Sequence, residues 1–153
     1  MSRDSGLGTR NSDRSTMQDR RLFHEELDVY RVSKDLAIEL FRETRSFPRS
    51  EQFGLTSQVR RAATSIPANI AEGAARRSKK EFVQFLGNAR GSAAELRVLI
   101  EIAAETDIMP PERSRTYKAT VDRLSSMLSG LIRRNRANQG PPESRVPSPE
   151  SRP

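Results

Sequence analysis

The sequence predicts an all-α protein, an antiparallel up-down-up-down four-helix bundle. Apolar side chains recur at helical spacing in four separate segments, and no segment alternates apolar and polar residues as a half-buried strand does. The links between the four segments are only two to six residues long. Links this short force neighbouring helices to run antiparallel, which predicts the bundle.

The first helix is predicted over residues 28–46, with Asp28 as its N-cap. It should end near Phe47-Pro48, because proline disfavours helix in the residue before it. Its inward face is a stripe of side chains three or four residues apart: Val29, Val32, Leu36 and Leu40.

The second helix is predicted over residues 50–75. Pro67 lies inside it, and an interior proline removes a backbone hydrogen bond, so we expect a kink at this residue. Gly73 should end the helix. The side chains expected to point inward are Phe53, Val59, Ala63, Ile66 and Ile70.

The third helix is predicted over residues 78–106 and opens on a capping box, Ser78 with Glu81. Gly87 and Gly91 share one of its faces. Each glycine inside a helix costs about 1 kcal/mol relative to alanine, so the pair predicts that another backbone packs very close.

The fourth helix is predicted over residues 111–137, after Pro110-Pro111, because proline is favoured at the first helical position. Residues 1–21 and 139–153 lack apolar periodicity and are predicted to be disordered tails, one basic and one rich in proline. The folded bundle should therefore span residues 22–138.

The composition excludes several classes of protein. There is no cysteine and only one histidine, His24, which removes disulfides, thiolate nucleophiles and Cys- or His-rich metal sites. No phosphate-binding glycine loop or nucleophile elbow is present. No apolar run approaches the roughly 20 residues of a membrane span. We therefore expect a cytoplasmic, non-enzymatic protein with no catalytic residues, metal, cofactor or membrane partner.

Two polar stripes follow the second and third helices at spacings of three and four residues. The sequence allows two interpretations. In the first, the stripes face each other in an interhelical hydrogen-bond network or are simply solvated. In the second, they form a seam between subunits or a nucleic-acid contact. The stripes are Arg61, Ser65, Asn69 and Glu72 on one helix, and Gln84, Asn88, Ser92 and Glu95 on the other.

The chain is basic, with 27 Lys and Arg against 20 Asp and Glu. In the predicted topology one end of the bundle collects nine bases: Arg20, Arg21, Arg76, Arg77, Lys79, Lys80, Arg133, Arg134 and Arg136. The helix dipole accounts for bases near helix C-termini, but it disfavours Lys79 and Lys80 at a helix N-terminus. Charge placed against local preference indicates a surface for a polyanion.

Two segments identify a resemblance: S-I-P-x-N-I-A-E-G (Ser65 to Gly73) and A-R-G-S-x-x-E-L (Ala89 to Leu96). Over about residues 22–135, and most weakly in the fourth helix, the chain resembles the four-helix-bundle family of 23S ribosomal RNA intervening-sequence proteins. That family is similar in fold to the accessory variability protein of diversity-generating retroelements, a pentameric barrel that binds nucleic acid and docks onto a reverse transcriptase. The resemblance implies a homo-oligomer, in particular a pentamer, with RNA or DNA and a reverse transcriptase as partners.

Charge and resemblance together predict a non-enzymatic homo-oligomer that binds RNA or DNA through its basic end, as an accessory to a reverse transcriptase or a ribosomal RNA element. The alternative is an oligomeric protein–protein adaptor whose basic charge serves only solubility. Salt dependence of binding separates the two, because phosphate contacts weaken steeply with salt.

Overall fold

The computed structural model describes residues 9–138. It contains four α-helices, α1 (Thr9–Glu43), α2 (Leu55–Ala74), α3 (Lys79–Glu105) and α4 (Pro111–Ala137), with two short 3₁₀ turns, Thr44–Ser46 and Arg49–Glu51, between α1 and α2. No strand occurs among these residues. The all-α prediction is confirmed. The predicted link length is wrong for the first link, which spans residues 44–54 because it holds the two 3₁₀ turns.

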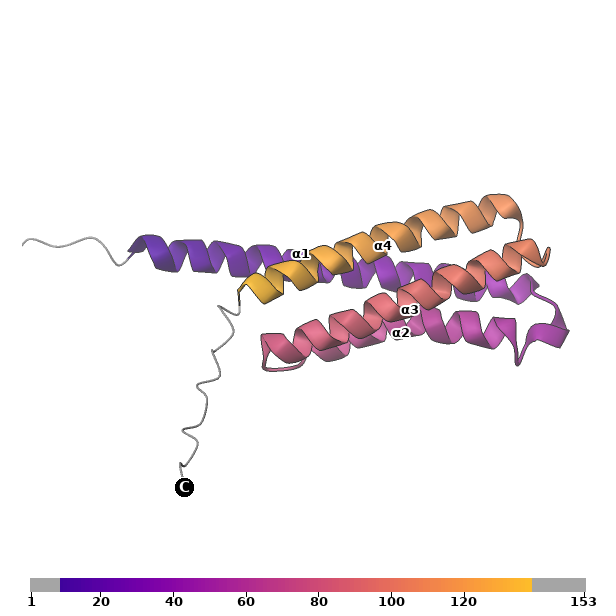
Figure 1. Cartoon of the computed structure of the whole chain (residues 1–153), viewed down its shortest axis with the longest axis horizontal. Coiled ribbons are helices and arrows are strands. Elements are labelled where there is room, and N and C mark those ends of the chain that lie inside the picture. Colours follow the sequence, from indigo (N-terminus) through magenta and orange to yellow (C-terminus); the bar gives the residue numbers. More distant parts are fainter. Residues whose placement is uncertain (1–8, 139–153) are drawn as a thin grey trace, which may run out of the picture.

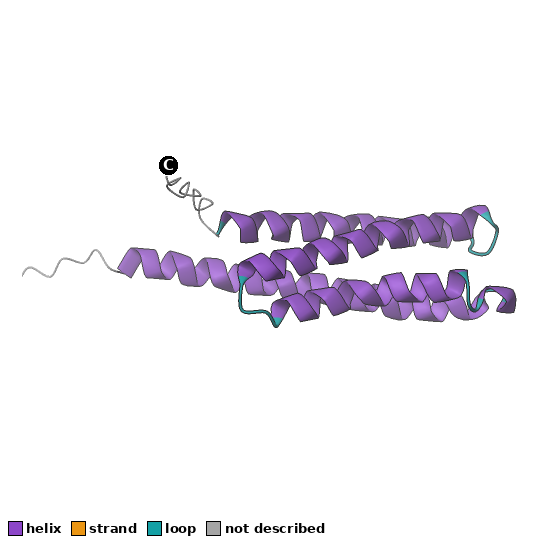
Figure 2. Cartoon of the chain, turned by 60° about the horizontal axis from the view of Figure 1, so that its bottom comes forward, coloured by secondary structure: helices purple, strands orange, loops and turns teal. Residues whose placement is uncertain are grey.

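The helices run alternately up and down and lie side by side (Figures 1 and 2). Each helix packs on its neighbours in sequence, and α1 also packs on α4, which closes the bundle. The α2–α3 turn and the end of α4 therefore lie at one end, beside α1 (Figure 1). We call this end the basic pole, after the nine bases named above, and the end with the other two links the distal pole.

The core is built from the inward-facing apolar side chains of the four helices, and most of the side chains predicted to point inward belong to it. All four helices contribute, and burial of each large apolar side chain stabilises the fold by roughly 1.5–3 kcal/mol. Fully buried side chains include Leu36 and Leu40 from α1, Ile66 and Ile70 from α2, Leu86, Leu96 and Ile100 from α3, and Leu124, Leu128 and Leu131 from α4.

The prediction of an unstructured first segment is wrong for residues 9–21, which belong to α1. Side chains from Asp13 to Arg21 are exposed, so packing does not order them. The segment contains no glycine or proline, however, and extending an existing helix adds one hydrogen bond per residue without a new nucleus. Asp28 consequently lies inside α1 and is not its N-cap. Residues 1–8 and 139–153 fall outside the described part of the chain, so the rest of the tail prediction stays open.

The helical extension carries α1 past the rest of the bundle. The Gln18 side-chain amide donates a hydrogen bond to the Asn138 side chain at 2.8 Å, just after the end of α4. Arg14 and Ser15 line a groove with Lys79 and Asn138, and the N-terminal end of α1 projects beyond the rest of the bundle (Figure 1).

Two further expectations concern the second helix. Phe53, predicted to point inward, is 91% exposed, because it lies in the turn before α2 begins at Leu55, and Leu55 takes the buried position. Pro67 lies inside α2, which is helical on both sides of it. The kink at Pro67 stays a prediction.

Candidate nucleic-acid interface

The α2–α3 turn places two lysines at the very start of α3. α2 ends at Ala74, and the Arg76 N–H then bonds the Gly73 carbonyl at 3.1 Å. Ser78 is extended and its hydroxyl accepts the Glu81 N–H at 3.1 Å, as the capping box predicts. Lys79 and Lys80 are therefore the first two residues of α3, where the helix dipole is unfavourable for positive charge.

Gly73 lets α3 approach α2 beneath this turn. It is buried, and a Cβ built on it would lie 2.7 Å from the Phe85 Cβ and 3.0 Å from Phe82 Cδ2. We expected Gly73 to end the helix, and α2 does end one residue later, but close packing is what requires a residue without a side chain here.

A groove at the basic pole is shared by three parts of the chain and measures 280 Å³. α4 contributes Asn135 to it. From α1 it receives Asp19, Phe23 and Glu26, and from the α2–α3 turn and the start of α3 it receives Arg76, Arg77 and Lys79. The structure thus brings three of the predicted bases together with an aromatic ring and two carboxylates.

The nine predicted bases fall into two groups. Arg21 and Arg134 both bond Glu25, at 3.2 and 2.6 Å, and Arg76 bonds Glu72 at 3.0 Å. Within residues 9–138 the other six form no ion pair, and all are exposed: Arg20, Arg77, Lys79, Lys80, Arg133 and Arg136.

Within residues 9–138 the two polar stripes contact each other at only one place. The hydroxyls of Ser65 and Ser92 share a hydrogen bond of 2.8 Å between α2 and α3, and Asn69 donates to the Ser65 hydroxyl at 3.0 Å. Glu72 bonds Arg76 on its own helix. The remaining members are exposed and form no bond to the facing helix in the described part of the chain: Arg61, Gln84, Asn88 and Glu95.

The outer face of α3 is open within the subunit. A Cβ built on Gly87 or Gly91 meets nothing within 4 Å, so no other part of the described chain packs close to these glycines. Val98 and Ile102 follow two and three turns after Gly91 on the same face and are 54% and 42% exposed. The prediction of a close backbone neighbour is therefore wrong within the subunit.

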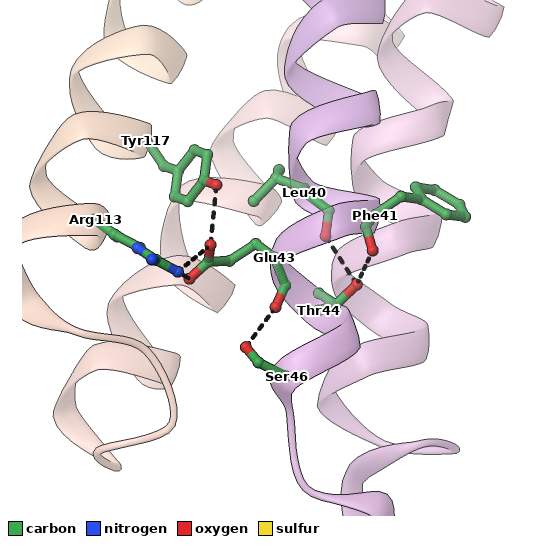
Figure 3. A network of polar contacts seen from close by, with 7 residues as sticks. All are labelled: Leu40, Phe41, Glu43, Thr44, Ser46, Arg113 and Tyr117. Atoms are coloured by element: carbon green, nitrogen blue, oxygen red, sulfur yellow. Dashed lines mark hydrogen bonds and ion pairs between the residues drawn. The ribbon is translucent and has the colours of Figure 1, made fainter.

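The distal pole holds a polar network that the sequence pattern does not predict (Figure 3). Glu43, at the end of α1, is buried and accepts two bonds from the Arg113 guanidinium, at 2.8 and 3.0 Å. The Tyr117 hydroxyl donates to the same carboxylate at 3.4 Å. Burial, and then the Glu43 charge, raise the pKa of Tyr117 to about 12. The partners are 70 or more residues apart, so only the fold reveals them.

The same pole also ties α2 to α1. The Thr44 hydroxyl donates to the Leu40 carbonyl at 2.8 Å, turning back onto α1 (Figure 3). Arg60 of α2 then donates to the Thr44 oxygen at 2.9 Å and stacks over the Phe41 ring. Side chains thus crosslink the distal pole. At the basic pole Arg134 bonds α4 to α1, and the six bases named above form no ion pair within residues 9–138.

The described part of the chain contains no candidate metal site and no candidate membrane span. Among residues 9–138, no group of three or more histidines and carboxylates is placed to hold a metal ion. None of the helices there combines the length and apolarity needed to cross a bilayer.

The antiparallel order of the helices and their shared core define a four-helix-bundle protein. The profile of the family described as 23S rRNA-intervening sequence protein matches residues 25–130, and the chain belongs to this family. The resemblance drawn from the two motifs is confirmed.

A solved structure shows the same fold. It is a crystal structure from Bacteroides thetaiotaomicron VPI-5482, described as a protein with unknown function from the S23 ribosomal protein family. The TM-score is 0.66 at 22% identity, and the comparison covers 71% of this chain and 98% of that one. No curated protein matches the chain.

Proposed function

We propose that this chain is a non-enzymatic, homo-oligomeric helical bundle that binds RNA or DNA through its basic pole, as an accessory to a ribosomal RNA element or a reverse transcriptase. The observation that carries the proposal is the group of six exposed bases at one end of the bundle that form no ion pair within residues 9–138. A phosphate backbone supplies the charge that these side chains lack, and its binding releases counterions.

Lys79 and Lys80 are the strongest part of this argument. Acidic side chains in the first turn stabilise a helix, because they complement its dipole. The first turn of α3 has one acidic residue, Glu81, beside the two lysines. Arg76 is a weaker candidate, since it bonds Glu72 and lies over the Phe85 ring, with its guanidinium carbon 5.0 Å from the ring centroid. We therefore assign phosphate contacts to Arg77, Lys79 and Lys80 first.

The test is a triple substitution of Arg77, Lys79 and Lys80 to Gln, with binding of labelled RNA and DNA followed by anisotropy over a range of salt concentrations. Loss of three phosphate contacts lowers the slope of log affinity against log salt by about 2–3. The matched control changes three exposed bases at the distal pole to Gln: Arg45, Arg49 and Arg115.

The control has the same net charge as the triple variant, so it separates a local site from general attraction. The proposal requires the pole variant to bind weakly while the control binds as the wild type does. Equal loss in both variants, or no loss in either, would contradict a site at the basic pole.

Self-association is the second part of the proposal, and we place it on the outer face of α3. Gly87 and Gly91 each lower helix stability by about 1 kcal/mol, and nothing in the described subunit uses the room they leave. Exposed Val98 and Ile102 continue the face. A second copy of the chain packed against α3 would use both features, and a pentamer is the assembly that the family resemblance implies.

Gly91→Leu tests this face. Because a Cβ at Gly91 meets nothing in the subunit, the variant should keep its fold, as circular dichroism can show. In the assembly the new side chain would obstruct the neighbouring copy, and light scattering should report dissociation. A 17.2 kDa wild-type monomer at micromolar concentration, or an unchanged assembly in the variant, would refute it.

One observation favours the adaptor alternative. Phe53 is 91% exposed beside a 720 Å³ groove between α2 and α3, lined also by Arg61, Ser65 and Ser92. An exposed phenylalanine beside a groove is typical of a protein contact. If the wild-type protein binds no nucleic acid at low salt, this alternative replaces the first.

A further inference from the structure

We propose that Phe23 is a stacking platform for an unpaired nucleobase, so that the basic pole selects single-stranded over double-stranded nucleic acid. This inference rests on the proposed function and names its ligand class. Stacking on aromatic side chains beside a basic groove is the general means by which proteins hold single strands.

Phe23 has a ring available for stacking. It is 61% exposed, and in the described part of the chain its ring makes one aromatic contact, an edge contact to His24 with centroids 6.1 Å apart. It lines the 280 Å³ groove of the basic pole and also an adjoining groove of 200 Å³ between α1 and α2. The ring therefore stands where the two grooves meet.

The adjoining groove is apolar and can take the face of a base. Its walls are Leu27 and Tyr30 from α1 and Ile70, Ala71 and Ala74 from α2. A nucleobase placed in this groove would remove the apolar surface from water. The favourable free energy of this burial is roughly proportional to the area covered.

Charge fixes the direction in which a strand would lie. Arg77 and Lys79 border the groove on one side of Phe23, whereas the carboxylates of Asp19 and Glu26 border it on the side of α1. Phosphates would therefore lie towards the turn, with the base directed inward over the Phe23 ring.

Glu26 gives this inner position a polar group. It lines both grooves, is partly buried, and forms no hydrogen bond within residues 9–138. Burial raises the pKa of Glu26, because it removes water from around the carboxylate. The amino group of an unpaired base is a donor that would satisfy this carboxylate. In a duplex the amino groups are engaged in base pairs and the base faces are stacked.

A second cation contacts a ring that lines the apolar groove. The Lys34 ammonium is 5.7 Å from the centroid of the Tyr30 ring, and Tyr30 lies two turns after Phe23 on the same face of α1. Positive charge is thus available beside Tyr30 as well as beside Phe23, which suits a polynucleotide that passes over both rings.

The experiment compares Phe23→Leu with the wild-type chain. Leu keeps an apolar side chain but removes the ring, and Phe53→Leu at the distal pole is the matched control. Four labelled ligands of one sequence are titrated by anisotropy: single-stranded RNA, single-stranded DNA, the DNA duplex, and a DNA strand with abasic positions. The RNA and DNA strands show whether the sugar contributes.

We expect Phe23→Leu to weaken single-strand binding about 5- to 150-fold, the range for loss of one stacked base. Binding of the duplex and of the abasic strand should change less than about twofold, because neither presents a base to the ring. The salt slope should stay the same, since no charge is removed, and Phe53→Leu should bind as the wild type does.

The outcomes separate this inference from the proposed function. Loss of binding in the Arg77, Lys79 and Lys80 variant, without loss in Phe23→Leu, would leave the function standing and overturn the stacking platform. Equal weakening of single strand and duplex by Phe23→Leu would also overturn it. A wild-type protein that binds none of the four ligands would overturn both.

Discussion

Substitution of Gly73 by Ala tests how tightly α3 is held against α2 beneath the basic turn. The added methyl group would lie 2.7 Å from the Phe85 Cβ and 3.0 Å from Phe82 Cδ2. The Phe85 Cβ is attached directly to the α3 backbone, so a change of rotamer cannot move it away. The start of α3, with Lys79 and Lys80, would have to shift.

The magnitude follows from comparison with Gly91→Ala. Both substitutions replace a helical glycine, so both gain about 1 kcal/mol of helix propensity. Nothing lies within 4 Å of the new methyl at Gly91 in the subunit, whereas overpacking at Gly73 costs about 1–3 kcal/mol. The propensity gain cancels in the difference, and Gly73→Ala should be less stable than Gly91→Ala by about 1–3 kcal/mol.

Urea unfolding followed by circular dichroism measures this difference. It should be done at a protein concentration where the midpoint no longer depends on concentration, because association of subunits stabilises the folded state. If Gly73→Ala were as stable as Gly91→Ala, close packing would not explain the glycine. If the two variants differ in stability as predicted but Gly73→Ala binds nucleic acid as the wild type does, the shift of the turn does not affect binding.

The distal network supports two more predictions. Glu43→Ala removes a buried carboxylate that binds Arg113 and Tyr117, and should lower the free energy of unfolding by about 1–2 kcal/mol. The loss is at the low end for bonds to a charged group because Arg113 is solvent-exposed. The control Asp122→Ala, in the exposed pair with Arg97, should leave the urea midpoint unchanged, and equal effects of the two substitutions would contradict the prediction. The Tyr117 pKa of about 12 means that the folded state keeps a proton that the unfolded state loses near pH 10, so stability should fall between about pH 10 and 12. Tyr117→Phe should flatten this fall, as unfolding free energies across that range would show, and an unchanged profile would refute the assignment.

The fold follows from local pattern and link length. Three- and four-residue spacing of apolar side chains locates all four helices, and the fourth has its predicted limits, residues 111–137. The capping box places the start of α3 because Ser78 and Glu81 act within one helical turn. The concentration of bases at one pole also follows, since antiparallel order and residue number decide which helix ends meet.

Other features depended on neighbours that are distant in sequence. Residues 9–21 lack an apolar stripe, yet they are helical because α1 already exists beside them. The contrast between Gly73, pressed against α3, and Gly91, open on the outer face, has no signature in the sequence. The pairing of Glu43 with Arg113, and the groove that joins Phe23 to Arg77, arise only when the helices pack. Spacing along the chain reports which face a residue occupies, but contact across helices depends on their relative rotation and separation, which only the tertiary structure decides.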